Sequence, residues 1–173
     1  MIILGIDPGT ATIGYAIIKK IKDCKAIDDK RFEVLDFGCI TTLTNFTTGE
    51  RLQQIHDQIN ALIKKHKPDL ISVESLYFFK NLKTVMPVSQ AKGVILLSAA
   101  QKKIPVLEFT PLQMKMTIAG YGRAEKKQVQ EMTKKLLDLS SFNMKENNRN
   151  KDDAADALGV AICAGLHNKF LIN

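Results

Sequence analysis

Short apolar segments in the N-terminal part of the chain have the character of β-strands. Residues 2–7 (Ile-Ile-Leu-Gly-Ile-Asp) are almost wholly apolar, and residues 8–10 (Pro-Gly-Thr) are typical of a turn. Apolar segments at 13–18 and 31–42 follow, separated by a turn that contains Asp-Asp-Lys at 28–30. We therefore expect a central strand and two further strands in an antiparallel meander.

From residue 49 onward the apolar spacing changes to that of helices. Isoleucine and leucine recur every three or four residues between Gly49 and Lys67, which predicts an amphipathic helix that Pro68 ends. The same reasoning predicts a strand at 70–74, a helix at 82–103, a strand at 104–109, a short helix from 110 to 120, a helix at 124–139, a polar loop at 140–151 and a last helix at 152–167. This order predicts an α/β fold with a mixed five-stranded sheet, three antiparallel strands and then two parallel ones, covered by helices on both faces. The length predicts one domain over residues 1–173.

The charge of the chain indicates a polyanionic partner. The 25 lysines and arginines exceed the 18 acids and give a formal charge of +7. Between Pro111 and Lys135 six residues are basic and two are acidic, which concentrates the excess in one segment. Taken alone, this segment fits either a nucleic-acid contact or a solvated helix face.

The remaining composition favours a cytoplasmic protein. Cys24, Cys39 and Cys163 are scattered and odd in number, which favours free thiols in a reducing compartment over disulfides or a zinc site. No apolar run approaches the roughly 18–20 residues of a membrane span. The first residues lack the basic start of a signal peptide, so we expect no membrane partner.

Four carboxylates stand at the ends of elements that are predicted to be buried. Asp7 ends the first strand, Glu74 ends the fourth, and Asp153 and Asp156 share one face at the start of the last helix. Because a helix connects the first three strands to the fourth, the first and fourth strands should lie parallel and side by side. Their carboxyl ends then meet in the crevice where open α/β sheets keep their sites.

Converging carboxylates repel one another unless cations neutralise them. Oxygen ligands suit hard ions such as Mg²⁺ and Mn²⁺, and four carboxylates can hold two divalent ions. Two such ions next to a basic helix predict hydrolysis of a phosphodiester. The alternative is that Asp153 and Asp156 are helix-start charges that interact with the helix dipole.

Several segments together resemble the bacterial RuvC Holliday-junction resolvases of the ribonuclease H-like superfamily. The first segment, Ile-Leu-Gly-Ile-Asp-Pro-Gly-Thr, includes Asp7, and Asp-Ala-Ala-Asp-Ala-Leu includes Asp153 and Asp156. The matching segments are residues 3–10, 73–81, 90–94, 120–129 and 153–158, in the order of the family. Each segment alone is weakly specific, whereas the combination covers almost the whole chain.

The resemblance implies a function and an assembly. It implies a ribonuclease H-like sheet, and a homodimer that cuts four-way DNA junctions by two symmetric nicks and leaves 5′-phosphate and 3′-hydroxyl ends in recombination and repair. It assigns the metal-binding and catalytic roles to Asp7, Glu74, Asp153 and Asp156, with two Mg²⁺ ions that Mn²⁺ can replace. A branch-migration motor is the further partner that it implies.

The resemblance and the basic segment also name expected DNA contacts. Two junction-contacting lysines of the family correspond to Lys115 and Lys126, and we expect DNA contacts from Lys80, Arg123 and Lys127 as well. The aromatic residue that enters the crossover corresponds to Tyr77, with Phe78 and Phe79 as alternatives. An exposed ring near a catalytic acid is suited to stacking on an unpaired base. The preferred cleavage sequence and the role of the loop at 140–151 are left open.

Three other functions share part of this pattern. Proteins of the actin and sugar-kinase group have a similar strand and turn to residues 6–10 but generally need two such domains. Ribonucleases H that cut RNA/DNA hybrids take one acid from the helix after the third strand, here near residues 50–63, instead of from the fourth strand. A non-catalytic junction-binding protein would gain affinity for phosphates by losing the acids.

Overall fold

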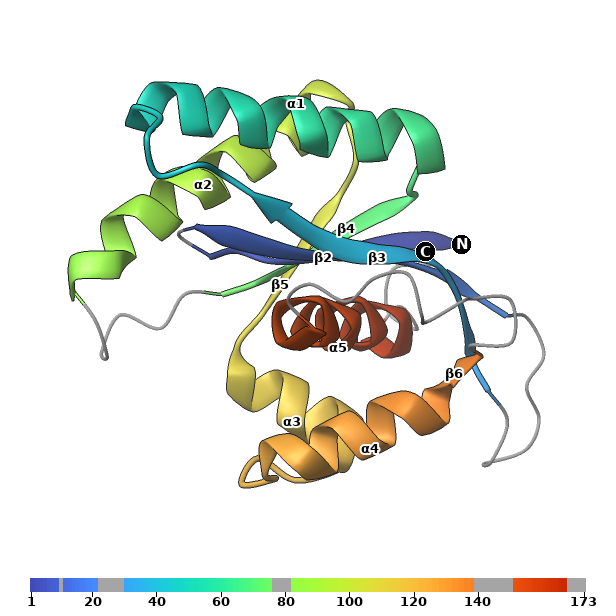
Figure 1. Cartoon of the computed structure of the whole chain (residues 1–173). Coiled ribbons are helices and arrows are strands. Elements are labelled where there is room, and N and C mark those ends of the chain that lie inside the picture. The colour runs from blue at the N-terminus through green and yellow to red at the C-terminus, as the bar shows by residue number, and fades with distance from the viewer. Residues whose placement is uncertain (10, 22–29, 76–81, 139–150, 168–173) are drawn as a thin grey trace.

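The computed structural model describes residues 1–9, 11–21, 30–75, 82–138 and 151–167 (Figure 1). Its elements, in chain order, are β1 (Ile2–Asp7), β2 (Thr12–Lys20), β3 (Phe32–Thr41), α1 (Thr48–His66), β4 (Leu70–Glu74), α2 (Leu82–Gln101), β5 (Val106–Phe109), α3 (Pro111–Ala119), α4 (Lys126–Leu136), β6 (Leu137–Asp138) and α5 (Lys151–His167). None of the helices in these ranges combines the length and the apolar character needed to cross a membrane.

The sheet is mixed and has the strand order β5-β4-β1-β2-β3-β6. As predicted, β1, β2 and β3 form an antiparallel meander, and β4 and β5 add to it in parallel with β1. The predicted number of five strands is wrong, because β6 pairs in parallel with Phe32 and Glu33 of β3. Leu137 occupies an apolar position that continues the period of the preceding helix. The apolar pattern therefore predicted that this helix ends at residue 139, whereas α4 ends at Leu136.

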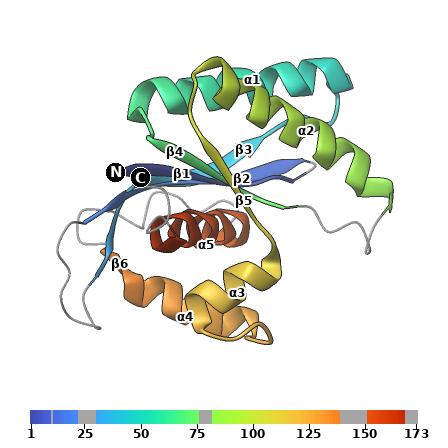
Figure 2. The same cartoon turned by 180° about the vertical axis from the view of Figure 1, so that it is seen from behind.

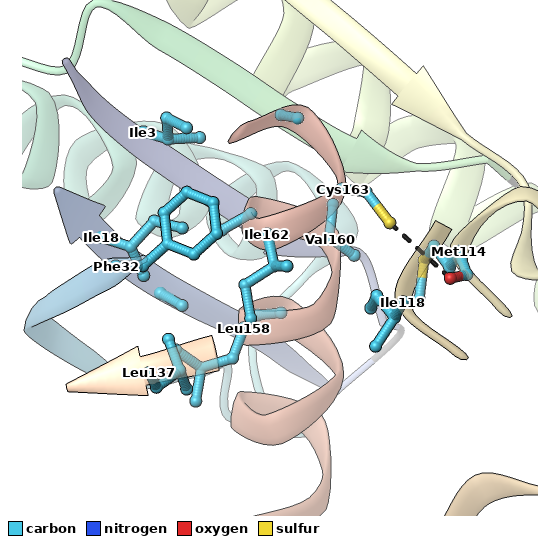
Figure 3. Close-up of a cluster of buried hydrophobic side chains, with 14 of the residues drawn as sticks. Ile3, Ile18, Phe32, Met114, Ile118, Leu137, Leu158, Val160, Ile162 and Cys163 are labelled. Atoms are coloured by element: carbon cyan, nitrogen blue, oxygen red, sulfur yellow. Dashed lines mark hydrogen bonds between the residues drawn. The ribbon is translucent and has the colours of Figure 1, made fainter. Parts of the chain in front are cut away.

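Helices cover both faces of the sheet, as expected. Helices α1 and α2 lie on one face, and α5 lies on the other with α3 and α4 outside it (Figures 1 and 2). Each face has its own apolar core. The core around α5 includes Phe32, Leu158 and Ile162 (Figure 3), and the core under α1 and α2 includes Ile59 and Ile95.

Local sequence fixes where the helices begin. Thr47 accepts a hydrogen bond from the backbone of Glu50, whose carboxylate accepts one from the backbone of Thr47, which is a capping box. Thr110 and Gln113 form the same arrangement in front of α3, with Pro111 at the first helical position. Because α3 starts directly after β5, it begins near the edge of the sheet where β1 and β4 also end.

Candidate active site

Asp7 and Glu74 lie side by side at the carboxyl ends of two neighbouring parallel strands. Ile6 of β1 is in register with Val73 of β4, so the next residue on each strand is one of the two acids. Their side chains share a hydrogen bond. The predicted meeting of the first and fourth strands is therefore present, and it places two carboxyl groups in direct contact.

Burial raises the pKa of both carboxyls, whereas their contact shifts the two in opposite directions. Burial raises the pKa of Asp7 from 3.8 to about 6, the hydrogen bond from Glu74 lowers it, and the charges of Asp156 and Asp153 raise it. Burial and the charge of Asp7, together with their hydrogen bond, raise the pKa of Glu74 from 4.5 to about 8. The two carboxyls therefore titrate as a pair, and burial favours a proton shared between them.

Helix α5 brings the other two acids to the same edge. Asp153 and Asp156 lie in its first two turns, and their charges act on Asp7. The helix packs against β1, β2 and β4, and the buried Ser72 hydroxyl of β4 donates a hydrogen bond of 2.9 Å to the carbonyl of Val160. This contact fixes the height of the helix over the sheet.

Two glycines allow α5 to lie unusually close to the strands. A Cβ atom at Gly14 of β2 would collide with the carbonyl oxygen of Asp153, and one at Gly5 of β1 would lie 2.7 Å from the Cβ of Ala161. Sequence reasoning did not identify Gly14 as a site residue. A glycine inside an otherwise apolar strand often marks such a close approach, and that was the available indication.

Lys126 supplies a positive charge at the site. Its ammonium group lies 3.0 Å from the carboxylate of Asp156, and both side chains are partly open to solvent. The hydrogen bond to Asp156 raises the pKa of Lys126. The lysine charge in turn lowers the pKa of Asp7 and Glu74. Lys126, the first residue of α4, is thus the predicted DNA contact that the structure joins to the acids.

Of the other predicted DNA contacts, three lie within the described residues and two lie outside them. Lys115 on α3 is half-buried, whereas Arg123 and Lys127 are exposed, and in the described ranges none of these three forms an ion pair with the four acids. Tyr77 and Lys80 lie outside the described residues, as do Phe78 and Phe79. The loop predicted at 140–151 also lies outside them apart from its last residue, at which α5 begins.

Cys39 is a further neighbour of the site that the sequence did not reveal. It lies opposite Gly14 in the pairing of β2 with β3. Burial raises the pKa of its thiol, the charge of Asp153 raises it further, and a hydrogen bond with the backbone of Ala154 lowers it. The thiol therefore stays protonated at neutral pH and contacts the first turns of α5.

The four acids suit divalent cations by their chemistry. Carboxylate oxygens are the ligands that Mg²⁺ and Mn²⁺ prefer. In the described part of the chain no three His, Cys, Asp or Glu side chains already enclose a point where an ion could sit. The ammonium group of Lys126 offsets part of the negative charge of the acids, which otherwise repel one another.

The comparison with known proteins agrees with this geometry. The family model described as crossover junction endodeoxyribonuclease RuvC matches residues 3–164. The RuvC of Halothermothrix orenii is 43% identical over 173 residues, which covers 100% of this chain and 96% of that relative. The RuvC of Alkaliphilus oremlandii is 45% identical over 170 residues, covering 98% of this chain and 96% of that one.

Solved structures give the same result. The structure of Thermus thermophilus RuvC has a TM-score of 0.82 at 25% identity and covers 98% of this chain and 96% of that one. The same protein in complex with a Holliday junction substrate has a TM-score of 0.83 at 26% identity and covers 98% and 95%. The yeast mitochondrial Holliday junction resolvase, at 16% identity and a TM-score of 0.65, shares the fold over 93% of this chain and 77% of its own. With sequence and structural matches along nearly its whole length, the chain belongs to the RuvC family of crossover junction endodeoxyribonucleases and has their ribonuclease H-like fold.

Proposed function

We propose that this protein is a metal-dependent endodeoxyribonuclease that resolves four-way (Holliday) DNA junctions by paired symmetric nicks. The observation that carries the proposal is the meeting of Asp7, Glu74, Asp153 and Asp156 at one edge of the sheet, with Lys126 bonded to Asp156. Four distant segments of the chain, β1, β4, α4 and α5, supply these groups. The match to the RuvC family over residues 3–164 gives the arrangement its substrate class.

Each nick adds water across one phosphodiester and leaves a 5′-phosphate and a 3′-hydroxyl. We assign Asp7, Glu74, Asp153 and Asp156 as the ligands of two Mg²⁺ ions, which Mn²⁺ can replace. When bound, these ions supply a water of lowered pKa and stabilise charge on the departing oxygen. The strand ends hold Asp7 and Glu74, and the packing of α5 against the sheet holds Asp153 and Asp156 near them. The ammonium group of Lys126 can neutralise a phosphate bound there.

The DNA contacts extend from the acids across α3 and α4. Lys127 follows Lys126 on α4, Arg123 lies between α3 and α4, and Lys115 lies on α3; we assign all three phosphate contacts. Tyr77 and Lys80 follow Glu74 in the sequence, and we assign the Tyr77 ring to stacking at the crossover.

Two symmetric nicks require two active sites, and we propose that α2 forms the homodimer contact. Met86 and Leu97 expose 67% and 52% of their surface on this helix. With the exposed Gln90 and Gly93 they follow the spacing of one helical face, which has no partner in the described residues. The partner that drives branch migration is proposed from the family resemblance alone.

The structure gives no support to the ribonuclease H alternative. That reading requires an acid from α1 at the site. Glu50 is instead held in the capping box with Thr47, and Asp57 lies 3.4 Å from the ring of His56. The acid that lies next to Asp7 is Glu74, at the end of the fourth strand.

The proposal is tested by cleavage of an end-labelled mobile four-way junction in Mg²⁺, with linear duplex and RNA/DNA hybrid as alternative substrates. Asp7→Asn should retain junction binding, because it removes only negative charge, and should abolish cutting. Paired nicks in the junction alone, lost in the variant, are the expected result. Equal cutting by Asp7→Asn, or preference for the hybrid, would refute the proposal.

A further inference from the structure

A groove lies between the ends of α1 and α2, on the side of the sheet away from the acids. It has a volume of about 770 Å³. Its walls include the apolar side chains of Ala61, Ile63, Pro68 and Ile104. Pro68 precedes β4 and Ile104 precedes β5, so the groove opens at the amino ends of these strands, whereas Glu74 ends β4. The length of β4, about 15 Å, therefore separates the groove from the active site.

Lysines surround this apolar hollow. Lys64, Lys67 and Lys102 line it, all three are exposed, and none forms an ion pair within the described residues. The acidic residue among the lining residues is Asp57, whose carboxylate lies 3.4 Å from the ring of His56, so the lysines leave the rim with a net positive charge. The dipole of α1 favours Lys64 in its last turn. It does not explain why the lysines lie beside an apolar groove. Lys67 has the left-handed backbone (φ 49°) of a helix C-cap, with its N–H bonded to the carbonyl of Ile63.

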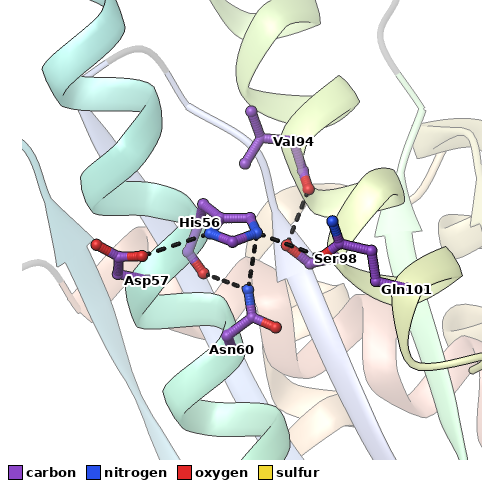
Figure 4. A network of polar contacts seen from close by, with 6 residues as sticks. All are labelled: His56, Asp57, Asn60, Val94, Ser98 and Gln101. Atoms are coloured by element: carbon purple, nitrogen blue, oxygen red, sulfur yellow. Dashed lines mark hydrogen bonds and ion pairs between the residues drawn. The ribbon is translucent and has the colours of Figure 1, made fainter.

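A polar network gives the groove a fixed wall (Figure 4). The His56 ring of α1 lies 3.4 Å from the amide oxygen of Gln101 on α2 and 3.1 Å from the amide nitrogen of Asn60. Asn60 also donates a hydrogen bond of 2.9 Å to the backbone carbonyl of His56. These contacts join the two helices that form the sides, so the hollow is held open between packed elements.

We propose that this groove binds a peptide segment of a partner protein, and that this segment carries both acidic and apolar side chains. Carboxylates of such a segment match the lysine rim, and its apolar side chains match Ile63, Pro68 and Ile104. A DNA duplex fits less well, because phosphates gain nothing from a concave apolar floor. The location leaves the carboxyl edge of the sheet free, so a peptide and a junction can be bound together. The inference does not depend on the proposed catalytic residues.

The first test measures binding of a fluorescein-labelled peptide composed of aspartates and glutamates with a terminal phenylalanine, by fluorescence anisotropy on the full chain. A second peptide carries serine in place of the phenylalanine. The charge-reversed pair Lys64→Glu and Lys102→Glu should weaken binding of the first peptide by about tenfold or more. The matched pair Lys134→Glu and Lys135→Glu, also exposed and at a helix end, should change it little.

A second variant separates groove binding from simple charge attraction. Ala61→Trp fills the groove without changing charge and should weaken binding as much as the lysine pair. Gln58→Trp, exposed on the same helix but outside the groove, should leave it unchanged. Folding of each variant is checked by its melting temperature, and unchanged junction cleavage shows that the active site is intact.

Three results would overturn the proposal. The first is undiminished binding by Ala61→Trp, and the second is equal binding of the two peptides, since either means that charge alone attracts the probe. The third is displacement of the peptide by linear duplex in wild type and in Asp7→Asn alike, which would make this surface a nucleic-acid contact. Failure of the peptide test with normal junction cleavage would leave the proposed function standing, so the two are distinguishable.

Discussion

Replacing Glu74 by glutamine should stabilise the metal-free protein at high pH. Burial against Asp7 raises the pKa of Glu74 from 4.5 to about 8. An acid whose pKa is higher in the folded than in the unfolded state favours folding most below its unfolded pKa. That contribution is lost as the pH rises towards the folded pKa, here between 4.5 and about 8. Glutamine cannot ionise, and its amide can still donate to the Asp7 carboxylate.

The size of the effect follows from the shift in pKa. One pKa unit is worth about 1.4 kcal/mol, so the full shift of Glu74 sets an upper bound of about 5 kcal/mol. Glu74 is still partly open to water and shares a proton with Asp7, which reduces the expected gain to about 1–3 kcal/mol near pH 8. For a domain of this size, that corresponds to a rise of several degrees in melting temperature, about 2–4 °C per kcal/mol.

Thermal melts of wild type and Glu74→Gln in EDTA, near pH 4 and near pH 8, measure this gain. The variant should melt higher at the upper pH and like wild type at the lower one. Glu131→Gln, the same change at an exposed position of α4, is the control and should show no such trend. Added Mg²⁺ should raise the melting temperature of wild type more than that of Glu74→Gln. A difference independent of pH, or a variant that melts lower near pH 8, would refute the reasoning.

Three further predictions concern the frame of the site, the dimer and the DNA. The new Cβ of Gly14→Ala would collide with the first turn of α5 and push it off the sheet, so this variant should lower cleavage by about 100-fold. Gly49→Ala is the control and should leave cleavage unchanged, because nothing lies within 4 Å of its new Cβ. Leu97→Asp places a charge on the exposed face of α2 and should yield a monomer in size-exclusion chromatography with light scattering; an unchanged mass would exclude this face as the dimer contact. Lys126→Ala should reduce the salt dependence of junction binding by about one unit of slope, and Lys134→Ala, farther along the same helix, should not; equal slopes for wild type and Lys126→Ala would show that Lys126 contacts no phosphate.

The parts of the site that follow from strand order could be predicted from the sequence. Asp7 and Glu74 each end an apolar strand, and the connection between these strands includes a helix, so their parallel pairing followed from general rules of topology. The structure confirms that pairing, with Ile6 beside Val73. The spacing of Asp153 and Asp156 likewise fixed their common helical face. Their metal-binding roles stay predictions.

Contacts between distant segments could not be predicted in the same way. The pair between Lys126 and Asp156 joins two helices, and no periodicity in either helix specifies which side chains of the other it meets. The close approach of α5 depends on Gly14, whose only local mark is a missing side chain. The short β6 was missed because Leu137 fits the apolar period of the helix before it.

On the proposed assignment, the ion pair between Lys126 and Asp156 links cation binding to DNA binding. Four carboxylates meet at one edge, where burial favours a proton on the Asp7–Glu74 pair and the ammonium group of Lys126 offsets Asp156. A divalent cation that uses all four acids must displace that proton and compete with that ammonium group. The displaced Lys126 side chain is then free to pair with a phosphate. A junction phosphate that attracts Lys126 therefore makes the free energy of cation binding more favourable. Because such coupling is reciprocal, a bound cation makes the free energy of phosphate binding more favourable by the same amount. If the acids and Lys126 act as proposed, the ion pair between α4 and α5 makes the site most stable when metal and DNA are both bound.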